Sequence, residues 1–243
     1  MRSEPLLEKT CRNSRRWCPR LSVDILAWGL AIYVAVVLNT AFWRAAAAAG
    51  AFTGNGAITT AISLFLIIVA LNVLLARPFC TRWTTRPVLS AFLLIAVFVS
   101  FFSDRYAVHF DVGMARNILA TDPAESRELA TTALLGHVLL YATLPLLLIW
   151  GSVLRWTSKR RSLLLALGSV ALAVALVVAS ALLGFKDVSA LMRNNPELRY
   201  LVAPSNILVS FGRIAAKKWQ GRDAGPRQVV AADARLDGHA AVT

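Results

Sequence analysis

Five long apolar stretches constrain the fold of this chain more than any other feature of its sequence. Each approaches or exceeds the roughly 20 residues that an α-helix needs to cross the hydrocarbon core of a bilayer. Hydrophobic residues make up 57% of the 243 positions, and a soluble domain of this length has shorter apolar runs. The pattern predicts an all-α membrane protein. Its five transmembrane helices are expected at residues 23–43, 57–76, 87–103, 129–154 and 162–184.

The basic residues are unevenly distributed, and their positions orient the predicted helices. Thirteen of the 26 lysines and arginines fall in three segments beside apolar ends, at residues 2–20, 77–86 and 155–161. Such an excess marks the cytoplasmic side of a membrane protein. We therefore expect a multi-pass membrane protein with a cytoplasmic N-terminus and a C-terminus on the opposite face, which is the periplasm if the membrane is a bacterial inner membrane. The net charge of +13 is explained by this orientation, so nucleic-acid binding is not expected.

The segments outside the spans divide the chain further. Residues 1–22 form a basic cytoplasmic N-terminus, and residues 104–128 form a polar periplasmic loop between the third and fourth spans. Residues 185–220 form a periplasmic bridging segment. In it, Pro204-Ser205-Asn206 is a helix start signal, and the amphipathic stretch at 207–219 predicts a helix lying at the membrane interface. Residues 221–243 lack periodicity, which predicts a linker or a disordered C-terminal tail.

Few of the polar side chains within or beside the spans indicate a transport, ligand-binding or metal-binding role. No charged residue lies deep in any span, which disfavours an ion or proton transporter. Asn39 and Asn72 lie inside or near the ends of the first two spans, where amides usually form interhelical hydrogen bonds. The cysteines, Cys11, Cys18 and Cys80, are expected as free thiols on the reducing cytoplasmic side. Their spacing does not indicate a metal site.

The periplasmic loop contains Asn117, Thr121 and Glu125, spaced four and four apart. On one continuous helix these residues would share a face. A carboxylate there could meet an ammonium group, while the amide and hydroxyl could bind phosphate or ester oxygens of a zwitterionic headgroup. A structural interpretation stays open beside this one. Asp122 and Pro123 are typical of a helix start, with Glu125 as a capping residue for the fourth span.

Several short motifs occur in a fixed order between residues 19 and 225. In chain order they are Arg20-Leu21-Ser22, Leu38-Asn39-Thr40-Ala41-Phe42-Trp43, Arg86-Pro87, Phe110-Asp111, Met114, Arg116-Asn117-Ile118-Leu119-Ala120-Thr121-Asp122-Pro123-Ala124-Glu125, Leu144-Pro145, Arg193-Asn194-Asn195-Pro196-Glu197-Leu198-Arg199-Tyr200 and Pro204-Ser205-Asn206. This ordered set resembles the membrane part of the phosphoethanolamine transferases that modify lipid A. That family includes the mobile colistin-resistance enzymes. At Asn195-Pro196 the chain departs from relatives, which tend to be more basic there.

The resemblance implies an architecture and an activity. It implies five membrane helices, a bridging segment with an interfacial helix, and a periplasmic hydrolase-like domain that carries a threonine nucleophile and zinc. Such enzymes move phosphoethanolamine from phosphatidylethanolamine to a lipid A phosphate. By the same resemblance, Asn117, Thr121 and Glu125 bind the lipid donor.

The C-terminal end of the chain departs from the family pattern. No threonine after Gly221 has a suitable context for a nucleophile, and His239 with Asp233 and Asp237 is too sparse for a zinc site. We therefore expect a membrane domain without its catalytic domain, inactive alone, with no cofactor of its own. Its expected partners are phosphatidylethanolamine, other membrane lipids and a separate catalytic domain. The alternative is a small non-enzymatic membrane protein that binds lipid or scaffolds partners.

Overall fold

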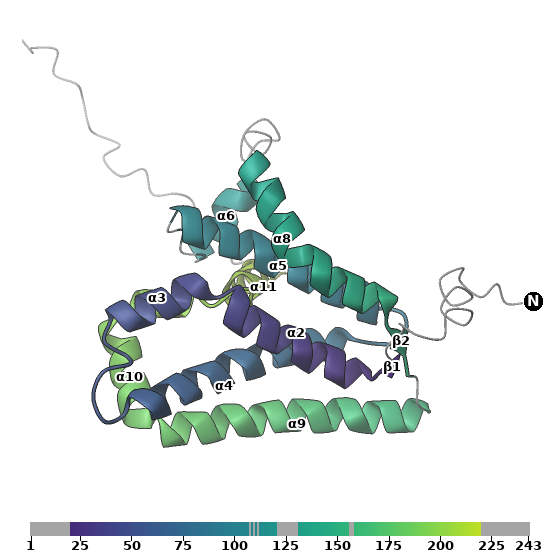
Figure 1. The fold of residues 1–243 in the computed structure, drawn as a ribbon, viewed down its shortest axis with the longest axis horizontal. Coiled ribbons are helices and arrows are strands. Elements are labelled where there is room, and N and C mark those ends of the chain that lie inside the picture. The colour runs from purple at the N-terminus through teal and green to yellow at the C-terminus, as the bar shows by residue number, and fades with distance from the viewer. Residues whose placement is uncertain are drawn as a thin grey trace, which may run out of the picture.

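The computed structural model describes residues 20–106, 108, 110, 112–120, 131–155 and 158–219. This part of the chain is mostly helical, and its longest helices lie roughly side by side (Figure 1). It also contains two 3₁₀ helices, η1 (Arg77–Phe79) and η2 (Pro196–Tyr200). The α-helices are α2 (Val23–Val37), α3 (Thr40–Ala48), α4 (Ala57–Ala76), α5 (Thr85–Tyr106), α6 (Val112–Ala120), α8 (Thr132–Gly151), α9 (Lys159–Leu183), α10 (Phe185–Asn194) and α11 (Ser205–Trp219).

Four helices are long and apolar enough to cross a membrane: α4 together with η1, α5, α8 and α9. They correspond to the last four expected spans, and their ends differ from the sequence prediction by at most three residues. The expected bounds of α4 match because Gly56 precedes its first residue and Arg77-Pro78 follow its last. Glycine and proline are the two poorest helix formers, so both ends are marked in the sequence.

The first expected span, residues 23–43, is not one continuous helix. Helices α2 and α3 are bent by 49° relative to each other, with Asn39 at the break. The Asn39 side chain donates from Nδ2 to the carbonyl oxygen of Val34 at 2.8 Å, and so occupies an acceptor at the end of α2. An asparagine that hydrogen-bonds to nearby backbone competes with helix continuation. The bent pair provides a fifth membrane span only if it crosses the membrane as one unit.

The start of α8 differs from the expectation for the fourth span. Its N-cap is Thr131, whose hydroxyl oxygen accepts a hydrogen bond from the backbone N–H of Leu134 at 3.3 Å. The prediction that Asp122 and Glu125 cap this helix is therefore wrong, because a closer hydroxyl residue performs that role. Asp122 and Glu125 themselves lie outside the described residues.

The described parts of the three basic segments lie at one end of the molecule. The parallel strands β1 (Arg20–Leu21) and β2 (Val153–Leu154) pair there, joining the start of α2 to the end of α8. At the start of α5, Arg86 donates from Nη2 to the carbonyl oxygen of Ser152 at 3.1 Å. These contacts gather the expected cytoplasmic segments on one side, as the charge pattern requires.

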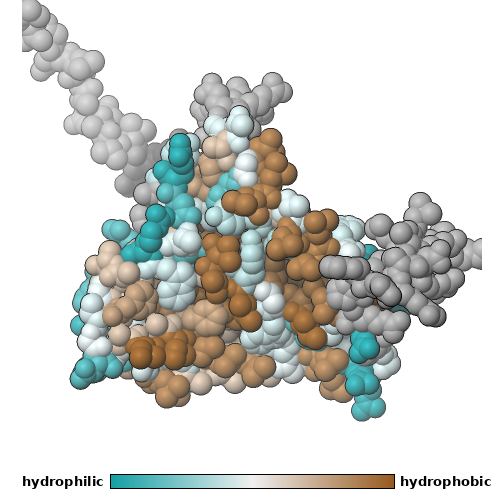
Figure 2. Space-filling model, viewed as in Figure 1, coloured by the Kyte–Doolittle hydropathy of each residue, from teal (hydrophilic) through white to brown (hydrophobic). Residues whose placement is uncertain are grey.

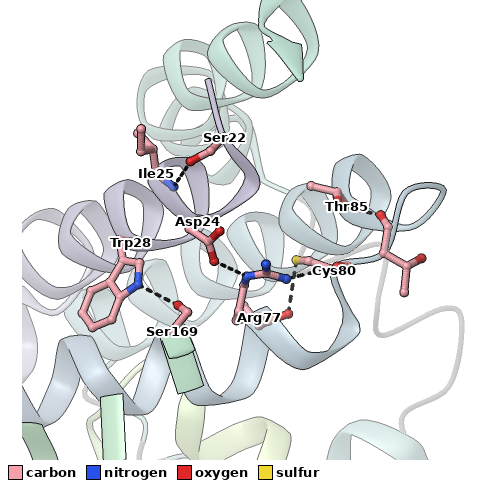
Figure 3. A network of polar contacts seen from close by, with 10 residues as sticks. Ser22, Asp24, Ile25, Trp28, Arg77, Cys80, Thr85 and Ser169 are labelled. Carbon is pink, nitrogen blue, oxygen red and sulfur yellow. Dashed lines mark hydrogen bonds and ion pairs between the residues drawn. The ribbon is translucent and has the colours of Figure 1, made fainter. Parts of the chain in front are cut away.

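An ion pair at this end, between a buried arginine and a partly buried aspartate, was not predicted from the sequence (Figure 3). Arg77, only 3% exposed, donates from Nε to Asp24 Oδ1 at 2.7 Å and from Nη1 to the carbonyl oxygen of Cys80 at 3.2 Å. Nearby, Trp28 of α2 donates from Nε1 to Ser169 Oγ of α9 at 2.8 Å. The pair joins α2 to the end of α4, and the tryptophan joins α2 to α9.

Apolar side chains form the interior and also cover much of the surface. One buried cluster joins α2, α5 and α8, and a second joins α2, α3, α4, α9 and α10. Helices α8 and α9 nevertheless expose many leucines, such as Leu140 and Leu183, and Figure 2 shows broad hydrophobic areas on the face it displays. Exposed apolar area on this scale is typical of helices that contact lipid rather than water.

The bridging segment contains the helix predicted for residues 207–219. It is α11, and it begins at Ser205, within the predicted start signal Pro204-Ser205-Asn206. Helix α11 packs against α6 and contacts α4, which the sequence did not indicate. Its predicted place at the membrane interface stays a prediction. The expected C-terminal tail, residues 221–243, and nearly all of the basic N-terminus lie outside the described residues.

Candidate functional site

The predicted donor-binding residues fall on α6 and on the segment after it. Asn117 lies in the last turn of α6, and its side chain is exposed. Thr121 and Glu125 lie outside the described residues, so their shared face with Asn117 stays a prediction. The structure therefore places one member of the predicted triad, on the surface of a short helix.

Helix α6 is held in place by an apolar cluster beneath it. Val99 of α5, Phe110 before α6, and Ala203 and Ile207 near the start of α11 are all buried there. Met114 of α6 packs against this cluster from a partly buried position. Burying apolar area stabilises such a contact by roughly 25 cal/mol per Å². The exposed face of α6, which carries Asn117, is thus fixed relative to α11.

Asn206 was predicted only as part of a helix start. In the structure it also forms a polar clamp between three segments. Its Nδ2 donates to the carbonyl oxygen of Phe110 and to that of Tyr200, the latter at 3.1 Å. One amide therefore ties the entrance of α6 to η2 and to α11. Its signal in the sequence was its place directly after Pro204-Ser205, but both acceptors are backbone groups, which no residue type reveals.

Asn39 and Asn72 both bind the segment that leads into α11. Asn39 is buried; its Oδ1 accepts from the N–H of Ala203 at 2.8 Å, and its Nδ2 donates to the carbonyl of Ala203 at 3.0 Å. Asn72 Oδ1 accepts from Ser205 Oγ at 2.9 Å. The predicted interhelical hydrogen bond is confirmed for Asn72, which joins α4 to α11, whereas Asn39 joins the break after α2 to the non-helical backbone of Ala203. Their partners, however, belong to the bridging segment rather than to another span.

Asp104 lies at the end of α5. It forms an ion pair with Arg44 of α3 and accepts a hydrogen bond from Thr40 Oγ1 at 2.6 Å. Ser100 Oγ lies 3.4 Å from the same carboxylate. Asp104 therefore connects α3 to α5 at the end of the molecule opposite the strand pair, which is a structural function.

A metal site does not fit the residues that the structure describes. Within those ranges, no group of three or more His, Cys, Asp or Glu side chains could hold a metal ion. Zinc needs a tetrahedral set of such ligands. The zinc implied by the family resemblance therefore has no site in the described part of this chain.

Comparison with known proteins identifies the family. The family model described as phosphoethanolamine transferase EptA/EptB matches residues 67–219. The chain belongs to this family. The match covers α11 and α6 as well as the membrane helices from the middle of α4 onward, so it includes the region around Asn117. The resemblance carried by the ordered motifs is confirmed.

Curated relatives agree with this assignment. Phosphoethanolamine transferase EptA of Escherichia coli (strain K12) is 29% identical over 199 residues, covering 81% of this chain and 36% of that protein. Phosphatidylethanolamine transferase Mcr-1 of Escherichia coli is 24% identical over 202 residues, covering 82% of this chain and 37% of that protein. The chain is similar to the N-terminal region of these transferases and spans little more than a third of their length.

A solved structure supports the fold. The integral membrane protein lipooligosaccharide phosphoethanolamine transferase A (EptA) from Neisseria meningitidis superposes with a TM-score of 0.75 at 23% identity. The superposition covers 85% of this chain and 38% of that structure. The likeness shows that the chain has the fold of the membrane region of this transferase family.

Proposed function

We propose that this chain is the membrane domain of a lipid A phosphoethanolamine transferase and that it binds the phosphatidylethanolamine donor. The observation that carries the proposal is the family match over residues 67–219, which includes α6 and its exposed Asn117. The fixed packing of α6 on α11 supports it, because a binding site needs a rigid support for its polar groups.

The proposed donor site consists of Asn117, Thr121 and Glu125. The Glu125 carboxylate pairs with the ammonium group of the ethanolamine, while the Asn117 amide and the Thr121 hydroxyl donate to phosphate or ester oxygens. The transfer itself needs a nucleophile and a metal, which the family resemblance assigns to a periplasmic catalytic domain. In this scheme the chain holds and orients the donor beside that domain, which lowers the entropic cost of the reaction.

The proposed topology places five spans in the inner membrane, with α2 and α3 together as the first. The N-terminus lies in the cytoplasm, while α6, α11 and the C-terminus lie on the periplasmic side. The gathering of Arg20, Arg86 and the segment after β2 at one end supports this orientation, because basic residues are retained in the cytoplasm. Helix α11 lies along the outer membrane interface.

Direct measurement of donor binding tests the proposal. The purified chain is titrated with phosphatidylethanolamine and, separately, with phosphatidylcholine of the same acyl chains, and bound lipid is counted by native mass spectrometry. Removing one charge-assisted hydrogen bond costs about 1.5–3 kcal/mol, so Glu125→Gln should weaken phosphatidylethanolamine binding roughly tenfold or more.

The matched control is Glu128→Gln, which removes the same charge three residues away. It should leave phosphatidylethanolamine binding unchanged. Equal loss in the two variants, or unchanged binding in Glu125→Gln, would show that Glu125 has no specific part in donor recognition.

A further inference from the structure

An elongated apolar groove lies between α4, α10 and α11. Its volume is about 450 Å³, and its walls include Leu64 and Leu75 of α4, Met192 of α10 and Val209 of α11. At 1.5 Å of rise per residue, the wall formed by α4 from Leu64 to Leu75 is about 16 Å long. An apolar groove of this length suits an extended hydrocarbon chain.

A second, smaller hollow adjoins one end of this groove and is basic. Its volume is about 260 Å³, and it is lined by Arg199, Tyr200, Asn206, Val209 and Arg213. Three of these residues, Arg199, Asn206 and Val209, also line the apolar groove, so the two spaces meet. The combined site has an apolar part and a cationic mouth.

The two arginines of the basic hollow lack acidic partners in the part of the chain that the structure describes. The ion pairs found there are Arg44 with Asp104 and Arg77 with Asp24. The guanidinium group of Arg199 instead lies 5.0 Å from the ring centre of Tyr200, and both arginines are exposed. Two cations that border one small hollow repel each other, and an anion bound between them removes that repulsion.

We propose that this combined site binds an anionic glycerophospholipid of the bilayer. The lipid phosphate accepts hydrogen bonds from Arg199 and Arg213, because guanidinium groups match phosphate geometry. One acyl chain lies along α4 in the groove, and Val209 marks the boundary between headgroup and chain. Basic pockets beside membrane helices recognise anionic headgroups in this manner. None of the lining residues named for the two spaces belongs to the proposed donor site, and this site selects net negative charge rather than an ammonium group.

Lipid competition on the purified full chain tests the headgroup part of the proposal. Phosphatidylglycerol and phosphatidylcholine with identical acyl chains are titrated, and occupancy is measured by native mass spectrometry. Phosphatidylglycerol should bind roughly tenfold more tightly, and Arg199→Gln with Arg213→Gln should abolish that preference. The matched control pair, Arg105→Gln with Arg193→Gln, removes the same charge from exposed positions that line neither space, and should keep the preference.

A second variant tests the acyl-chain part. Val209→Trp should lower phosphatidylglycerol occupancy by filling the junction, and leave binding of inorganic phosphate to the arginines unchanged. Helical circular dichroism and size-exclusion elution confirm that each variant is folded. Equal binding of the two lipids, equal loss in the control pair, unaltered lipid binding in Val209→Trp, or binding of phosphomonoester lipids alone would overturn the proposal. Asn117→Ala should leave phosphatidylglycerol binding intact, so failure of the donor proposal is distinguishable from failure of this one.

Discussion

At the scale of single residues, the buried Arg77 depends on its ion pair with the partly buried Asp24. A guanidinium group that is 3% exposed needs its counter-charge 2.7 Å away. Removing one partner of such a pair costs about 3–5 kcal/mol, because the other charge stays buried. We expect Asp24→Asn to lower the unfolding free energy by about 3 kcal/mol in a denaturation titration of the detergent-solubilised chain.

Two comparison variants make this prediction specific. Asp187→Asn alters an exposed aspartate of α10 and should change stability by less than about 0.5 kcal/mol. Adding Arg77→Met to Asp24→Asn should recover part of the lost stability, since the buried charge is then absent. A loss in Asp24→Asn no larger than that in Asp187→Asn would show that the pair contributes nothing.

The Cys80 thiol provides a prediction that depends on pH. Burial raises the pKa of Cys80 to about 11, although the nearby positive charge of Arg77 opposes the shift. A raised thiol pKa lowers the thiolate fraction at any pH below it, and thiolate is the reactive form. In a chain with Cys11→Ser and Cys18→Ser, maleimide labelling of Cys80 at pH 8 should be roughly 100-fold slower than in the denatured chain.

The labelling rate of the folded chain should continue to rise as the pH increases from 9 toward 11, while that of the denatured chain levels off above about 9. Both rates are read by mass spectrometry at fixed times. Folded and denatured chains that label at equal rates would contradict the buried, protonated state of this thiol.

At the scale of elements, the attachment of α11 to the membrane helices depends on Asn39. Its amide exchanges two hydrogen bonds with the backbone of Ala203. We expect Asn39→Leu, which keeps the side-chain size, to cost about 2–3 kcal/mol because it leaves buried backbone groups of Ala203 unpaired. Amide hydrogen exchange in α11 should accelerate.

Asn195→Leu is the matched control, because the Asn195 side chain bonds only locally, from Nδ2 to the carbonyl oxygen of Leu191 at 3.2 Å. It should leave exchange in α11 unchanged. Similar protection of α11 in wild type and Asn39→Leu would mean that apolar packing alone holds this helix.

The sequence predicted those elements whose signals are local. The start of α11 at Ser205 and both ends of α4 follow from prolines and a glycine in the adjacent sequence. The break after α2 was not predicted, because an asparagine in an apolar stretch does not reveal that it bonds to Val34 within α2 and to Ala203, 164 residues away. Likewise, Arg77 was counted among cytoplasmic basic residues, and only the fold reveals its partner Asp24. At the candidate site, the predicted Asn117 is found exposed on α6, whereas the clamp formed by Asn206 acts through backbone acceptors that carry no sequence signal.

At the scale of the whole molecule, the proposed topology predicts the location of each end. An alkaline phosphatase fused after residue 225 should be active, because the enzyme folds only in the periplasm, and a fusion after Arg82 should be inactive. In the proposed topology the end that carries Arg20 and Arg86 lies in the cytoplasm, because basic residues are retained on that side. An inactive fusion after residue 225, at normal expression, would overturn the arrangement of five spans with a periplasmic C-terminus.

The central claim is that this chain positions a phosphatidylethanolamine donor for transfer to lipid A. The most direct measurement joins the chain, after residue 219, to the catalytic domain of Escherichia coli EptA and analyses lipid A by mass spectrometry. The fusion should add phosphoethanolamine to lipid A. The fusion with Glu125→Ala should add at least about tenfold less at equal membrane abundance, because the ammonium group loses its carboxylate partner. Undiminished modification by the Glu125→Ala fusion would contradict the claim.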